Sequence, residues 1–149
     1  MDKAAAIKVK KYVTFEVQGE HYCLKINSVR EVLEDTEFTD VPNSPSFVMG
    51  VINLRGVILT VIDGSKYITG IPIKVSDSSR ILVFEDDDSG HQVGILVDSV
   101  SEVIVISEDD VNPFLKKDGG KKYVRGLYHR KDDVCVVLNE GKLFEDSGI

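Results

Sequence analysis

Short runs of β-branched and aromatic residues, closely spaced and separated by Gly, Pro or Asp, fill most of this 149-residue chain. The runs expected to form strands cover residues 12–17, 21–24, 47–54, 57–62, 80–84, 92–97, 100–106, 124–129 and 134–138. Runs of this length that end at turn residues predict strands. Many short strands at close spacing predict an all-β barrel or sandwich, although periodicity alone does not distinguish two barrels from one sandwich.

The segment Gly50-Val51-Ile52-Asn53-Leu54-Arg55-Gly56 lies between two of these runs. Gly56 can adopt backbone angles that are closed to residues with a Cβ, which suits a tight turn between two strands. Arg55 is costly to bury unless it is paired, so we expect it at the rim of the sheet, where its guanidinium matches a carboxylate. The simplest interpretation is a hairpin whose tip carries a solvated arginine.

Helix is expected only in short segments. Asn27 or Ser28 can cap a helical turn that continues through Leu33, a second short segment is expected near Lys66, and Asn139 can cap a short C-terminal helix ending near Glu145. A chain of this length is expected to form one domain, with residues 1–10 as a flexible leader and residues 11–149 as the folded part.

Composition narrows the classes of function. The net charge of −7 argues against nucleic-acid binding. No stretch approaches the roughly 20 apolar residues that span a bilayer, and we expect no secretory signal and no membrane insertion. A disulfide between Cys23 and Cys135 is possible in principle, but both lie in apolar strand-like runs and are better interpreted as small core residues.

The candidate metal and catalytic sites in the sequence lack the ligands or partner residues that such sites need. The acidic loop that starts at Glu85 has Gly90 where a calcium loop turns, but the bidentate acid of that loop would be Leu96. The three histidines lack the spacing of zinc ligands. A Cys–His pair assembled in space stays open, although nothing favours one. The sequence predicts no catalytic residue, metal or cofactor, which leaves interaction chemistry, with apolar side chains ringed by fixed charges.

Several ordered motifs resemble the CheW family, the adaptor proteins of bacterial chemotaxis. The Gly50–Gly56 segment resembles the core motif of that family, and its Gly50, Asn53 and Gly56 match the motif's structural positions. The similar motifs are residues 26–32, residues 41–47, and the strand pair Gly94-Ile95-Leu96-Val97-Asp98-Ser99-Val100-Ser101-Glu102-Val103 with its Gly94 and Asp98. Together they extend from about Tyr12 to about Phe144.

The resemblance implies a fold, a function and a set of contact residues. The fold would be all-β, with two small, interlocked SH3-like five-stranded barrels that share an apolar seam. The protein would be a non-enzymatic cytoplasmic adaptor, recruited to membrane-bound receptor arrays, that joins the cytoplasmic tip of a chemoreceptor to the regulatory domain of the histidine kinase CheA. The residues that match family contact positions are Val29, Glu31, Arg55, Val100 and Val103.

One rival hypothesis and one departure from the family pattern accompany this interpretation. The rival is a small β-barrel protein that binds a ligand or catalyses a reaction in the seam between its halves, which a deep polar cavity with perturbed pKa values would favour. The departure is Thr60-Val61-Ile62-Asp63-Gly64-Ser65, which lacks the family's usual proline, leucine and arginine. We expect a looser turn there.

Overall fold

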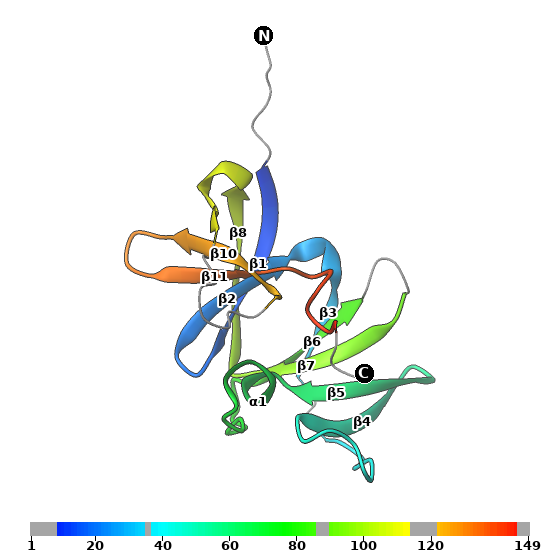
Figure 1. Ribbon diagram of the computed structural model, residues 1–149. Helices are drawn as coiled ribbons and strands as arrows, with labels where there is room; N and C mark the ends of the chain where they lie inside the picture. The colour runs from blue at the N-terminus through cyan, green and yellow to red at the C-terminus, as the bar shows by residue number, and fades with distance from the viewer. Residues whose placement is uncertain (1–8, 35–36, 86–89, 114–121, 146–149) are drawn as a thin grey trace.

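The computed structural model describes residues 9–34, 37–85, 90–113 and 122–145, and these are mostly β-strand (Figure 1). The strands are β1 (Val9–Val17), β2 (Glu20–Lys25), β3 (Val29–Leu33), β4 (Val48–Leu54), β5 (Val57–Asp63), β6 (Arg80–Glu85), β7 (Gln92–Val97), β8 (Ser99–Ser107), β9 (Asn112–Pro113), β10 (Val124–His129) and β11 (Val134–Leu138). Helix α1 (Gly64–Thr69) and the 3-10 turns Ile26–Ser28 and Glu108–Asp110 complete the described elements. The predicted all-β class is confirmed.

The strands form two sheets, and the chain passes from one sheet to the other twice. The first sheet has the order β8-β1-β2-β11-β10-β9 and the second has the order β3-β6-β7-β5-β4. The chain leaves the first sheet after β2 and returns to it through β8. Each sheet contains one parallel pair, β2 with β11 and β5 with β7, among antiparallel neighbours. The two halves of the molecule seen in Figure 1 are therefore built from interleaved segments of the sequence.

Strands next to the seam are buried on both faces. On β6, Leu82 and Phe84 pack into the seam between the sheets, whereas Ile81 and Val83 fill the interior of the second barrel. On β2, Tyr22 and Leu24 face the seam and Cys23 faces the interior of the first barrel. Because successive strand residues point to opposite faces, a strand between two cores must be apolar throughout. The predicted apolar seam between two barrels is confirmed.

Ion pairs link elements at the open edges of each sheet. In the second sheet the edge strands are β3 and β4, and Glu31 of β3 pairs with Arg55 in the turn after β4. In the first sheet Glu108, which follows edge strand β8, pairs with Arg125 of β10. Arg125 Nη1 also donates to the Tyr12 hydroxyl at 2.8 Å. These contacts connect strands that share no ladder hydrogen bonds, and they favour a curled sheet.

Two of the three predicted helical segments are wrong in detail. The helical turn expected through Leu33 stops at Ser28, because Val29–Leu33 pairs with β6 as strand β3. The expected C-terminal helix is a series of turns through Glu145. The Asn139 side chain accepts from the N–H of Gly141 at 3.0 Å, and Lys142 and Glu145 donate to carbonyls three residues back. The segment expected near Lys66 is confirmed as α1.

Both cysteines are free and fully buried in the first barrel, as predicted for core residues. Strand β1 begins at Val9, inside the segment expected to be a leader, and residues 1–8 lie outside the described part of the chain. Residues 86–89, in the acidic loop that starts at Glu85, also lie outside it. Within the described residues, no helix is long and apolar enough to cross a bilayer.

Candidate protein-binding site

The β4–β5 hairpin has the tight turn that its glycine predicted. Leu54 pairs with Val57, and the two residues between them, Arg55 and Gly56, have φ values of 52° and 85°. Two central residues with positive φ are typical of the turn whose twist matches two-stranded hairpins. The Asn53 side chain accepts from the N–H of Gly56 at 2.9 Å, which fixes the turn from inside the motif.

Arg55 is exposed at the hairpin tip but is not simply solvated. Its side chain is 70% exposed and pairs with Glu31, whose side chain is 30% exposed. Hydrogen bonding to Glu31 and its negative charge raise the pKa of Arg55. The pair links the hairpin tip to β3 and presents charge of both signs at the surface.

Gly50, Gly94 and Asp98 have structural contacts. A Cβ on Gly50 would lie 2.4 Å from the Thr39 carbonyl oxygen, because the chain before β4 crosses over it. A Cβ on Gly94 would lie 2.9 Å from a side-chain carbon of Ile81 in the barrel interior. Asp98 accepts from the N–H of Gln18 at 2.7 Å and so joins the β7–β8 connection to the β1–β2 turn.

The three predicted contact valines lie in two different environments. Val29 of β3 and Val100 of β8 are half-buried and pack against the seam cluster, next to Phe84 and Phe15 respectively. Val103 is 49% exposed on β8, an edge strand of the first sheet. The structure thus brings Glu31 together with Arg55, places Val29 and Val100 on a common core, and leaves Val103 open to a partner.

Other exposed apolar residues extend these surfaces. Val105 is 54% exposed and lies two residues beyond Val103, on the same face of β8. Val57 and Ile58, next to the Arg55 turn, are 57% and 64% exposed. The sequence analysis did not single them out. For β8, the alternation of side chains along a strand could have identified them. Ile104 and Ile106 face inward, so Val103 and Val105 face outward.

Several hydrogen bonds hold the turn after β5, where the sequence departs from the family pattern. Asp63 Oδ1 accepts from the N–H of Lys66 and caps α1, and its Oδ2 accepts from the N–H of Ile73, both at 2.9 Å. A Cβ on Gly64 would lie 2.6 Å from the Leu96 carbonyl oxygen. The hydroxyl of Ser65 donates to the Ile71 carbonyl at 2.6 Å.

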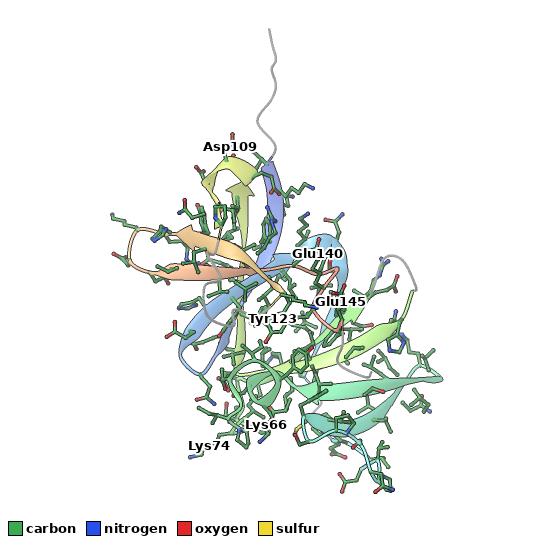
Figure 2. All side chains as sticks on the ribbon, in the orientation of Figure 1. Lys66, Lys74, Asp109, Tyr123, Glu140 and Glu145 are labelled. Atoms are coloured by element: carbon green, nitrogen blue, oxygen red, sulfur yellow. The ribbon has the colours of Figure 1, made fainter. Side chains whose placement is uncertain are left out.

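Among the described residues of the seam, the structure shows no deep polar cavity of the kind that the rival hypothesis needs. The void in the seam measures about 10 Å3, and the lining residues, which are apolar apart from a tyrosine, are Phe15, Ile62, Gly64, Tyr67, Ile68, Ile95, Leu138, Leu143 and Phe144. Tyr123, labelled at the centre of Figure 2, stacks on Tyr67, and burial raises its pKa to about 12. The Tyr123 hydroxyl is buried without a hydrogen-bond partner among the described residues, and the aromatic rings around it are packing contacts.

A double barrel whose seam is filled, and whose outer features are a charged hairpin and an apolar edge strand, is a binding scaffold. Residues 11–148 match the CheW-like domain family. The chain is 32% identical to the chemotaxis protein CheW of Thermotoga maritima over 96% of this chain and 93% of that protein. It is 31% identical to the chemotaxis protein CheW of Rhizobium meliloti over 79% of this chain and 76% of that protein.

A solved structure agrees with these sequence matches. The scaffolding protein TtCheW from Thermoanaerobacter tengcongensis superposes with a TM-score of 0.83 at 36% identity, covering 95% of this chain and 97% of that one. The chain belongs to the CheW-like family. It is a non-enzymatic adaptor of chemotaxis signalling, as the motifs predicted.

Proposed function

We propose that this adaptor joins the cytoplasmic tip of a chemoreceptor to the regulatory domain of the histidine kinase CheA, within receptor arrays on the cytoplasmic side of the membrane. Membership of the CheW-like family is the observation that carries this proposal. The contact residues are Val29, Glu31, Arg55, Val100 and Val103. The backbone around this surface depends on five structural positions, which are Gly50, Asn53, Gly56, Gly94 and Asp98.

The proposed mechanism is geometric. A protein that holds both partners raises the effective concentration of kinase near receptor. It also transmits a conformational bias if the two states of one partner contact it differently. The Glu31–Arg55 pair suits this role, because it fixes a charged hairpin against β3 while leaving the guanidinium largely exposed.

Titration calorimetry against a receptor-tip fragment and a CheA regulatory-domain fragment tests the proposal. We expect Val103→Glu to weaken binding to one fragment at least about tenfold, because a charge placed in an apolar contact is desolvated and unpaired. Val75→Glu is the matched control, since Val75 is 46% exposed but lies in the connection between α1 and β6. Wild-type protein that binds neither fragment at high micromolar concentration contradicts the proposal.

The Glu31–Arg55 pair can be tested by exchanging its charges. Glu31→Arg combined with Arg55→Glu keeps an ion pair between β3 and the hairpin but inverts the charge at each position. If these charges contact a partner, the double variant binds weakly although it melts like wild type, and added salt weakens wild-type binding. If the pair only positions the hairpin, the double variant binds each fragment as tightly as wild type does.

A further inference from the structure

A hollow of about 470 Å3 in the first barrel gathers three of the chain's lysines in a protein of net charge −7. It lies where β1 begins and β2 ends, next to Glu140, which Figure 2 labels. We call it the lysine hollow, and its lining residues are Val9, Lys10, Lys11, Lys25, Ile26, Asn27, Ser28 and Glu140. None of these residues belongs to the proposed contact set.

Lys10 and Lys25 lie on the same face of two neighbouring strands, and both line the lysine hollow. Tyr12 of β1 pairs with Lys25 of β2, and Lys10 lies on the same face of β1 as Tyr12. Hydrogen bonding to Lys25, and its positive charge, lower the pKa of Lys10, whereas Glu108 and Glu140 oppose this effect. Adjacent ammonium groups favour a shared counter-ion.

Glu140 supplies only part of the opposite charge. Its Oε1 lies 3.5 Å from Lys25 Nζ, and it is the one acidic side chain among the described residues that line the hollow. Lys10 adds a second positive charge on the face of Lys25, whereas Lys11, the next residue of β1, points to the opposite face. An additional carboxylate placed near Lys10 and Lys25 would reduce the repulsion between them, and charge complementarity therefore specifies an anionic occupant.

The rim of the lysine hollow is partly apolar. Val9 is 51% exposed and Ile26 is 37% exposed, and both line the same space as the lysines. Apolar side chains contribute nothing to holding a bare inorganic anion, which is bound by converging hydrogen-bond donors. A peptide that carries both carboxylates and aliphatic side chains matches both parts of the lining.

We propose that the lysine hollow binds an acidic segment of a partner protein. A carboxylate of the segment lies near Lys10 and Lys25, and an aliphatic side chain contacts Val9 and Ile26. This contact is separate from the receptor and kinase contacts proposed above and does not rest on them, because it uses a different part of the surface.

Nuclear magnetic resonance titration of the 15N-labelled full chain tests this site with defined probes. The probes are a synthetic peptide of alternating Glu and Leu, the same peptide with Gln in place of Glu, and inorganic phosphate. We expect the Glu-containing peptide to shift the amide signals of Lys10, Lys25 and Ile26 in a saturable manner that added salt weakens. The Gln-containing peptide and phosphate are expected to leave these signals in place.

Two double variants with the same change of net charge provide the comparison. Lys10→Gln with Lys25→Gln should weaken binding of the Glu-containing peptide about tenfold, which corresponds to the loss of two charge contacts, one exposed and one half-buried. Lys66→Gln with Lys74→Gln should bind like wild type, because Figure 2 places these lysines well away from Glu140. Equal weakening in both double variants overturns the proposal. Equally tight binding of the Gln-containing peptide, or the same shifts with phosphate alone, also overturns it.

Discussion

Gly50 and Gly56 stand at the two ends of one seven-residue motif, but each is required for a different physical reason. Gly56 is open to solvent on its Cβ side and is needed for its φ of 85°. Gly50 has a φ of 150° and also lacks space, since the Thr39 carbonyl oxygen occupies the position of a Cβ. The sequence predicted the first role from the turn. It did not predict the second, because the crossing chain comes from outside the hairpin.

Alanine substitutions separate these two reasons. Gly50→Ala should lower the free energy of unfolding by about 2–4 kcal/mol, because it combines an unfavourable φ with a clash against backbone. Gly56→Ala should cost about 1 kcal/mol, since backbone strain is its only penalty. Urea denaturation followed by circular dichroism measures both. Equal losses would show that the chain around Thr39 moves aside freely.

The exposure of Arg55 could be predicted from the residue itself, but its partner could not. Its exposure and its affinity for a carboxylate follow from its chemistry and from the turn. Its pairing with Glu31 depends on the curl of the second sheet, which brings β3 towards the β4–β5 turn. That curvature arises from contacts among five strands, and no local pattern in the sequence encodes it.

At the scale of elements, most strands could be predicted and β3 could not. Strands β10 and β11 have the bounds that the sequence predicted, because the polar turn at residues 130–133 separates them. In β3, Arg30 and Glu31 interrupt the apolar residues, and the preceding Asn27 and Ser28 resemble a helix cap. Pairing with β6, which lies about fifty residues away, decides the conformation of this segment.

Helix α1 depends on a single buried carboxylate for its start. Asp63 is 5% exposed, and its two oxygens accept from the N–H groups of Lys66 and Ile73. We expect Asp63→Ala to lower the free energy of unfolding by about 2–4 kcal/mol, because it removes the helix cap and leaves the second donor without an acceptor. Urea denaturation measures this loss.

Asp63→Asn is the matched control for the helix cap. Its one carbonyl oxygen can still accept from Lys66, so it should retain more stability than Asp63→Ala. Equal losses in the two variants would mean that the carboxylate acts through its charge and not through the cap.

At the scale of the whole molecule, the seam joins the two barrels. Its buried strand residues come from β1, β2 and β11 in the first sheet and from β5, β6 and β7 in the second. The aromatic side chains of Tyr67 in α1, Tyr123 just before β10 and Phe144 in the C-terminal turns extend the same contact. Since the interleaved chain also crosses between the sheets, separating the barrels would expose apolar surface in both. We therefore propose that residues 11–149 fold as one cooperative domain.

Hydrogen exchange on a seam variant tests this cooperativity. Ile95 is 3% exposed on the seam face of β7, and Ile95→Ala should lower the free energy of unfolding by about 2–5 kcal/mol through the cavity that it leaves. If the two barrels unfold together, the most protected amides of β2 and β6 lose the same free energy, although Ile95 belongs only to the second sheet. Val137→Ala, in the interior of the first barrel, is the comparison, and it should lower protection equally in both sheets. A loss confined to the sheet that carries the substitution would show that the barrels unfold separately, and the adaptor would then consist of two linked domains.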